Sequence, residues 1–220
     1  VSLHGSIMEM TYNCMWLLNL GTITCIPIIV RSMIEALSAM SLIANDRDNI
    51  QEIIDIYHLQ RHKQALELIK LDLPQQDIEK LKAISEECIE KYKASKDTRG
   101  RPLSISERFE KTLGPLFSVA YKMHCSDAHN DIVALESRHV IKDDSGNYRF
   151  EFFRESSLRD CIPAIDAMLC CLLISTEIIS KNVTSRKKEK IKNAIHKFKR
   201  FKRRYFQQEI APVSRPFEME

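Results

Sequence analysis

A chain of 220 residues with 44% hydrophobic residues is long enough for one sizeable core and too apolar to be intrinsically disordered. Only 5 glycines and 7 prolines are present, which argues against a turn-rich sandwich or barrel and favours long helices. The net charge of +3 is unevenly spread, because residues 181–206 have twelve Lys and Arg against one acid. That segment carries +11 and leaves −8 for the rest of the chain, so we expect an anionic partner or an anionic neighbouring surface.

The first half of the chain is expected to form four helices separated by short breaks. Residues 3–20 have apolar side chains at helical spacing, and a more apolar helix with Pro27 in its first turn runs to about Ala44. After a polar turn, a long amphipathic helix has its predicted apolar stripe at Ile50, Ile53, Ile54, Tyr57, Ala65, Leu66 and Ile69. Leu73-Pro74 breaks it, and the helix over residues 75–95 has an inward stripe at Ile78, Leu81, Ile84, Cys88 and Tyr92.

The second half begins with a capping box, Ser104-Ile-Ser-Glu107, which predicts the start of a short helix. Gly114-Pro115 is then expected to end this helix and to begin another, which reaches about Cys125. Two β-like segments on either side of a polar, glycine-containing turn predict a small hairpin near residues 139–153. An apolar helix over residues 158–180 and a strongly basic helix follow.

These elements predict an all-α fold, a bundle of about six to seven helices with one small β-hairpin insertion. We expect residues 1–182 to form the bundle domain and residues 183–206 a basic amphipathic helix that packs on it or extends from it. Residues 207–220 are expected to be a flexible tail. The most apolar windows, residues 23–30 and 161–174, fall short of the ~20 continuous apolar residues of a membrane span, so no transmembrane segment is expected.

Cysteine usage gives an expectation for the cellular compartment. The seven cysteines are odd in number and irregularly spaced, and most lie in apolar helical segments. No signal peptide opens the chain. These features predict buried free thiols in a reducing compartment, and hence a cytoplasmic protein.

Arg31 and Glu35 interrupt an otherwise apolar helix. Their i, i+4 spacing places them on one face, where they can pair. A charge among apolar neighbours is costly unless it is paired. The pair is interpreted either as a structural ion pair at the edge of the core or as the lining of a polar pocket.

A second group of polar residues lies where a helix meets the loop before the hairpin. Tyr121, Ser126 and His129 combine hydroxyl groups with an imidazole, which is the chemistry of a hydrolase. No Gly-x-Ser-x-Gly elbow accompanies them. Capping and turn hydrogen bonds explain the same residues, so both interpretations stay open.

A third group comprises Asp55, His58 and His62 on one helical face. The two histidines have the spacing of the zinc-protease helix, but the glutamate of that motif is missing. We therefore expect solvated surface histidines, no metal site and no cofactor.

The basic C-terminal helix is the clearest candidate interface. An apolar stripe is interleaved with cations dense enough to attract phosphate backbones. An anionic membrane, an acidic protein partner or a solvated face packed on an acidic body would fit the same pattern. The candidate nucleic-acid-binding residues are Lys187, Lys188, Lys192, Lys199, Arg200, Arg203 and Arg204.

Several segments together resemble a known family. They are Arg31-Ser-x-x-Glu35, Tyr57 with Arg61-x-Lys63, Tyr121-x4-Ser126-x2-His129, and Leu135-Glu-Ser-Arg138 before the hairpin. Over about residues 3–180 the chain is similar to uncharacterised, mostly bacterial helical proteins, domain-of-unknown-function family 5677. This resemblance implies a helical bundle and a polar cluster of Arg31, Glu35, Arg61, Tyr121, Ser126 and His129. It implies no established activity.

A looser similarity connects the chain to abortive-infection and HEPN-type helical bundles, many of which act on RNA. The RNA-cleaving motif of those bundles, as the resemblance implies it, needs a His about four to six residues after an Arg. No His of this chain has an Arg at that upstream distance, so the sequence departs from that motif.

Two functional hypotheses follow. In the first, the protein is a nucleic-acid-binding component of a bacterial stress or phage-defence system, acting on RNA or DNA and accompanied by a protein partner from the same locus or by a second copy. In the second, it is a nuclease or other phosphoester hydrolase. His129 is then the general acid/base, Arg31 and Arg61 hold phosphate, Glu35 orients an arginine, and Tyr121 or Ser126 positions the substrate.

Overall fold

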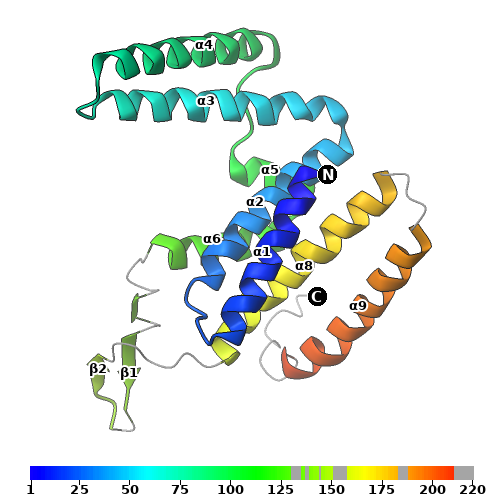
Figure 1. The fold of residues 1–220 in the computed structure, drawn as a ribbon. Coiled ribbons are helices and arrows are strands. Elements are labelled where there is room, and N and C mark those ends of the chain that lie inside the picture. Colours follow the sequence, from blue (N-terminus) through cyan, green and yellow to red (C-terminus); the bar gives the residue numbers. More distant parts are fainter. Residues whose placement is uncertain (130–134, 137–138, 144, 151–157, 183–187, 211–220) are drawn as a thin grey trace. The chain divides into compact units, whose positions relative to one another are not determined.

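The computed structural model describes the chain outside residues 130–134, 137–138, 144, 151–157, 183–187 and 211–220, and the side chains next to several of these gaps are also left out. Its elements are α1 (Ser2–Asn19), α2 (Ile26–Asn45), the 3-10 turn η1 (Arg47–Asn49), α3 (Ile50–Ile69), α4 (Gln75–Arg99), α5 (Ile105–Thr112), α6 (Pro115–His129), β1 (Val140–Lys142), β2 (Tyr148–Phe150), α8 (Leu158–Asn182) and α9 (Lys188–Ile210). Figure 1 shows helices throughout apart from one small hairpin. The predicted all-α fold with a hairpin insertion is confirmed.

The chain divides into two compact units. One unit is discontinuous and comprises residues 1–41 and 113–220, and the other comprises residues 42–112. The second unit is therefore inserted into the first along the sequence. The division into a bundle over 1–182, a basic helix and a tail stays a prediction.

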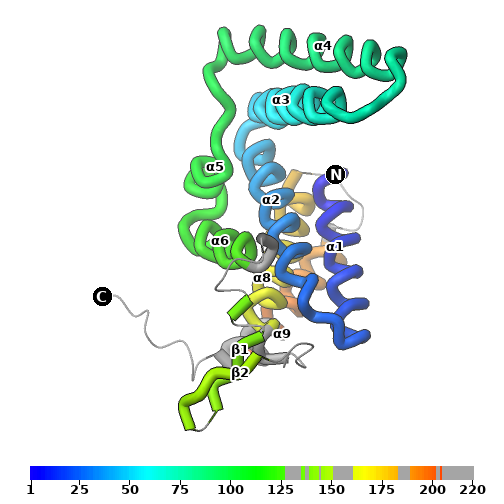
Figure 2. The backbone as a smooth tube through the Cα atoms, turned by 90° about the vertical axis from the view of Figure 1, so that its left-hand side faces the viewer, coloured from blue at the N-terminus to red at the C-terminus, as the bar shows by residue number. Residues whose placement is uncertain are grey.

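The core of the discontinuous unit is built on α2. Its inward face is fully buried and consists of the apolar residues Ile26, Val30, Met33, Ile34 and Leu37. Figure 2 shows α2 between α1 and α6. Helices α1 and α8 run antiparallel (Figure 1), and His4 of α1 is hydrogen-bonded to Ser175 of α8 at 3.1 Å. The apolar core of this unit therefore lies along α2, with α1 and α6 on either side of this helix.

Among the residues that the structure describes, two helical segments are long and apolar enough to cross a membrane on length and composition alone, namely α2 and residues 161–182 of α8. This is weak evidence, because the core helix of a globular protein passes the same test. In α2, 56% of the apolar window is buried inside the protein, as expected of a core helix, whereas 28% of the α8 window is buried. The absence of a transmembrane segment stays a prediction.

The inserted unit is dominated by the α3–α4 hairpin, and here the sequence prediction for α3 was partly wrong. Ile50, Ile54, Tyr57 and Leu66, assigned to the inward stripe, are exposed. Ala65 of the predicted stripe is buried as expected, and Asp55, which was not assigned to the stripe, is buried as well. The inward stripe predicted for α4 is confirmed, since its members are buried or half-buried.

Polar groups replace part of the expected apolar contact between α3 and α4. Asp55 is buried and accepts hydrogen bonds from Ser95 at 2.6 Å and Gln51 at 3.0 Å. His62 Nδ1 lies 2.8 Å from Ser85 Oγ. The expectation of solvated histidines at 58 and 62 was therefore wrong, because both side chains are partly buried and His62 bonds to the facing helix.

Local sequence signals are confirmed at the capping box and the hairpin. Ser104 N donates to Glu107 Oε2 at 2.7 Å, and Glu107 N donates back to Ser104 Oγ at 3.3 Å. In the hairpin, Val140 pairs with Phe150 in antiparallel register. Gly146 in its turn has φ +84°, a left-handed conformation that glycine adopts without steric cost.

All seven cysteines are free thiols. Those that are buried are Cys14, Cys88, Cys161 and Cys171, whereas Cys25 is exposed just before α2. Burial raises the pKa of the Cys14 thiol to about 11, so this cysteine is an inert apolar side chain at neutral pH.

Candidate functional site

Three of the predicted cluster residues meet between α2 and α6. The Tyr121 hydroxyl donates to Glu35 Oε1 at 2.8 Å and accepts from Arg31 Nη2 at 3.4 Å. Arg31 Nε lies 3.3 Å from Glu35 Oε1. We call Arg31, Glu35 and Tyr121 the α2–α6 polar cluster. Tyr121 lies 86 residues from Glu35 and 90 residues from Arg31 in the chain, so the cluster is a tertiary feature.

Aromatic and ionic contacts hold the cluster together. The Arg31 guanidinium carbon lies 5.5 Å from the centre of the Tyr121 ring, within the range of a cation–π contact. The Arg31 side chain is 27% exposed and that of Glu35 is 42% exposed. The cluster therefore lies at the edge of the core, where solutes reach its carboxylate and part of its guanidinium.

The neighbours of Tyr121 determine the pKa of its hydroxyl group. Burial, together with the hydrogen bond to Glu35, raises the pKa of Tyr121 to about 12, although the hydrogen bond from Arg31 acts in the opposite direction. The phenol is therefore protonated at neutral pH and donates to the carboxylate. It is a hydrogen-bond bridge rather than a base or nucleophile at that pH.

The other predicted members of the cluster are placed differently. Ser126 is half-buried in the last turns of α6. His129 is the last residue of α6, but its side chain lies outside the described part of the chain. Arg61 belongs to the inserted unit, where it donates to the Tyr57 hydroxyl at 2.9 Å. The catalytic roles given to these residues stay predictions.

Two residues next to the cluster were missed by the sequence reasoning. The nearby side chain of Cys125 contributes to the raised pKa of Tyr121. His124 is buried on the same helix. They follow Tyr121 by four and three residues, so the helical spacing around Tyr121 was the signal that could have found them.

Two of the three residues that were considered as metal ligands, and for which no metal was expected, have other partners. Asp55 accepts from Ser95 and Gln51, and His62 bonds to Ser85. Within the described residues, no three His, Cys, Asp or Glu side chains gather closely enough to hold a metal ion. These contacts assign the two residues to the packing of α3 on α4.

Helix α9 packs on α8 with one face and presents cations on the other. Its half-buried residues Ile191, Ile195 and Phe198 recur at i, i+4 and i+7. Lys199 forms an ion pair with Glu177 of α8. This part of the predicted apolar stripe is therefore directed toward the body of the discontinuous unit, whereas Ala194 and Phe201, which were predicted on the same stripe, are exposed.

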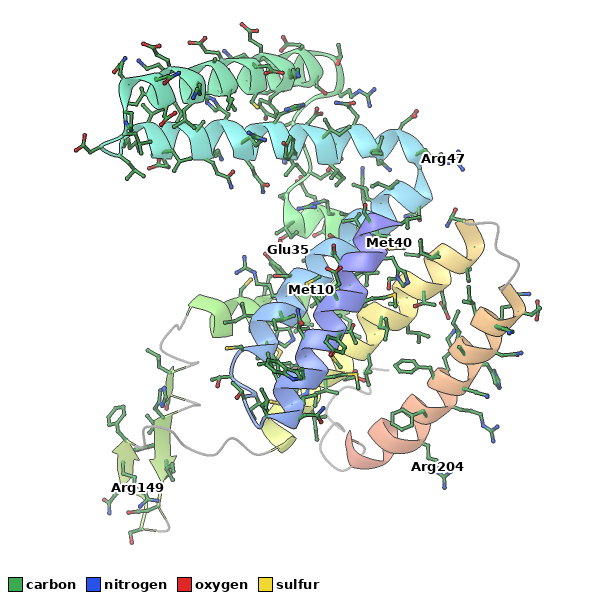
Figure 3. The ribbon with its side chains drawn as sticks, viewed as in Figure 1. Met10, Glu35, Met40, Arg47, Arg149 and Arg204 are labelled. Carbon is green, nitrogen blue, oxygen red and sulfur yellow. The ribbon has the colours of Figure 1, made fainter. Side chains whose placement is uncertain are left out.

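The outward face of α9 contains Lys190, Lys197 and Arg200. These residues are exposed and recur at i, i+7 and i+10, so they follow one side of the helix. Among the described ion pairs, none involves these three side chains. We call them the α9 basic face. Figure 3 labels Arg204, whose side chain extends from the same helix away from α8.

The predicted nucleic-acid-binding residues divide into three groups. Lys192 pairs with Glu189 at 2.9 Å and Lys199 pairs with Glu177, so their charges are partly neutralised. Arg200 and Arg204 are exposed. The residue Lys187 and the side chains of Lys188 and Arg203 lie outside the described part of the chain.

Comparison with known proteins places the chain in a family without assigning an activity. A family model matches residues 1–148, which contain the α2–α6 polar cluster but neither α8 nor α9. No curated protein and no solved structure matches the chain. Because the matched region covers most of the 220 residues, the chain belongs to the family of unknown function DUF5677.

Proposed function

We propose that this protein binds nucleic acid through the α9 basic face. The observation that carries the proposal is a row of three exposed cations that form no ion pair with any residue the structure describes, on a helix that packs on α8. At ~1.5 Å per residue, Lys190 to Arg200 span about 15 Å. One strand of a DNA duplex presents roughly four phosphates over that length.

The packing of α9 favours a phosphate backbone over a lipid surface. A helix that lies in a membrane interface buries its apolar face among the acyl chains. In α9 much of that face is already occupied, because Ile191, Ile195 and Phe198 are half-buried and the helix packs on α8, although Phe201 is 48% exposed. What α9 mainly offers to a partner is charge, and charge is the main determinant of sequence-independent nucleic-acid binding.

The proposal concerns the C-terminal part of this chain rather than the whole family. The family match ends at residue 148, before α8 and α9 begin. A role in a bacterial stress or phage-defence system stays a prediction from the sequence.

The test compares two triple variants that remove the same charge. The binding variant is Lys190→Gln, Lys197→Gln and Arg200→Gln. The control is Lys82→Gln, Lys93→Gln and Lys96→Gln, three exposed lysines of α4. Binding to labelled duplex DNA, single-stranded DNA and RNA is measured by fluorescence anisotropy over a range of salt concentrations.

The expected result is a flatter salt dependence in the binding variant alone. Each lost phosphate contact reduces the slope of log Kobs against log[salt] by about 0.7–0.9, so three losses reduce it by roughly 2 to 3. The control keeps the slope of the natural protein. Equal slopes in all three proteins would reject the proposal, and binding to an acidic peptide instead of nucleic acid would assign α9 to a protein partner.

A second candidate function is phosphoester hydrolysis at the α2–α6 polar cluster. The observation that favours it is the convergence of Arg31, Glu35 and Tyr121, partly exposed, within the family-matched region. An arginine next to a carboxylate is suited to holding a phosphate. Cleavage of RNA or DNA that is lost in both Arg31→Gln and His129→Ala, with folding intact, would support it, and full activity in either variant would remove that residue from the mechanism.

A further inference from the structure

Helix α1 exposes an apolar stripe on the side that faces away from the core. Its inward residues Ile7, Thr11 and Cys14 are buried. The outward apolar residues are each between 53% and 71% exposed. They recur at i, i+4, i+7, i+8 and i+12, the spacing of one helical face. We call them the α1 stripe: Met8, Tyr12, Met15, Trp16 and Leu20.

We propose that the α1 stripe binds the same stripe of a second copy of this chain and forms an antiparallel homodimer. A large exposed apolar patch marks an interaction site, and aromatic residues and methionine are enriched at interfaces. Since an aromatic side chain buries ~150–250 Å², the exposed fractions give the stripe on the order of 500 Å² per chain. Two copies together bury about 1,000 Å², which is where specific interfaces begin.

The charges of α1 favour a second copy over an anionic membrane. The helix has no Lys or Arg and a single acid, Glu9, whereas helices that lie on anionic membranes carry basic residues on their polar face. Parallel pairing would place the two Glu9 carboxylates side by side, with like-charge repulsion. An antiparallel pair avoids this repulsion.

The spacing of the stripe also predicts the register. A two-fold axis makes the interface self-complementary, so that each contact occurs twice. If the axis passes near residue 14, residue i of one copy faces residue 28 − i of the other, by approximate helical spacing. This register pairs Met8 with Leu20, Tyr12 with Trp16, and Glu9 with Asn19.

The first experiment measures mass in solution. The chain has a mass of 25.6 kDa, and sedimentation equilibrium of the natural protein at tens of micromolar is expected to give twice that value. Tyr12→Glu is expected to give the monomer mass, because it places a charge without a partner in an apolar interface. Ser6→Glu, which adds the same charge at an exposed position of α1 outside the stripe, is expected to stay dimeric.

A charge-complementation experiment tests the antiparallel register by mixing two variants with opposite charges. Tyr12→Glu and Trp16→Lys are each expected to be monomeric alone, and circular dichroism checks that each is folded. When the two are mixed, one Glu faces one Lys and one native Tyr–Trp pair is restored, so a heterodimer is expected. A mixture that stays monomeric would overturn the antiparallel register.

Two results would overturn the proposed dimer itself. A natural protein that sediments as a monomer at these concentrations, or a Tyr12→Glu protein that stays dimeric, rejects pairing through the α1 stripe. Pelleting of the monomer with phosphatidylcholine vesicles would then assign the stripe to a lipid surface.

Discussion

At the residue scale, one phenol joins two helices. The Tyr121 hydroxyl connects Arg31 and Glu35 of α2 to α6, and the Arg31–Glu35 pair alone is an ordinary i, i+4 contact. Exposed pairs of that kind contribute little to stability. The hydrogen bond to the carboxylate is therefore the stronger interaction, because hydrogen bonds to charged groups exceed those between neutral groups.

Replacing Tyr121 with Phe is expected to lower the free energy of unfolding by about 1–2 kcal/mol, which is the typical contribution of a hydrogen bond to a charged group. Urea unfolding monitored by circular dichroism measures it. The matched control is Tyr148→Phe on the exposed strand β2, where little change is expected. Equal effects at the two positions would contradict this role.

The same substitution predicts a difference in alkaline stability. The pKa of Tyr121 is about 12 in the folded protein, against 10.0 for an unperturbed tyrosine. A pKa raised on folding contributes stability below pH 10 that is lost as the pH rises toward 12. The difference in the free energy of unfolding between the natural protein and Tyr121→Phe is therefore expected to become smaller above pH 10. A difference that stays constant with pH would contradict the raised pKa of Tyr121.

At the scale of elements, polar groups hold the α3–α4 hairpin. Asp55 is buried and needs its donors, because an unpaired buried charge is costly. Ser95→Ala removes one of them and is expected to lower stability by about 1.5–3 kcal/mol, slightly offset by the better helix propensity of alanine. Hydrogen exchange of the α4 amides measures the effect, with the exposed Ser32→Ala as control. Similar exchange in the two variants would show that Asp55 does not depend on Ser95.

The capping box of α5 predicts sensitivity to acid. Hydrogen bonds from Arg101 and from the backbone and side chain of Ser104 lower the pKa of Glu107 to about 2. A pKa lowered on folding contributes stability above the unperturbed value of 4.5 that is lost as the pH falls toward 2. Glu107→Gln is therefore expected to show a shallower loss of thermal stability over that range. If the thermal stability of Glu107→Gln depends on pH in the same way as that of the natural protein, the capping box is not the source of the acid sensitivity.

Some features of these elements could be predicted from the sequence and others could not. The capping box and the hairpin turn were predictable because their hydrogen bonds join residues a few positions apart. The inward face of α3 was not, because this helix has apolar residues on more than one side and its partner helix selects the face with Asp55. The i, i+4 contact of Arg31 with Glu35 was predictable, whereas its connection to Tyr121, 86 residues beyond Glu35, follows no local period.

At the scale of the whole molecule, the acidic body and the basic C-terminal segment partly neutralise each other. Glu177 of α8 holds Lys199 of α9. Glu177→Gln is expected to release this ammonium group, raise nucleic-acid affinity and steepen the salt slope by about 0.7–0.9. Glu79→Gln, an exposed acid of α4, is the control in the same anisotropy assay. Weaker binding by Glu177→Gln would mean that the ion pair orients α9 for binding.

The insertion of one unit into the other has a consequence for biosynthesis. The inserted unit can fold once residues 42–112 have left the ribosome. Helix α1 can pack on α8 only after α8, which starts at residue 158, has been synthesised. At ~5–20 residues per second, this wait lasts on the order of ten to thirty seconds. During that time α1 lacks its contacts with α8, so nascent α1 is the segment that we expect a chaperone to protect.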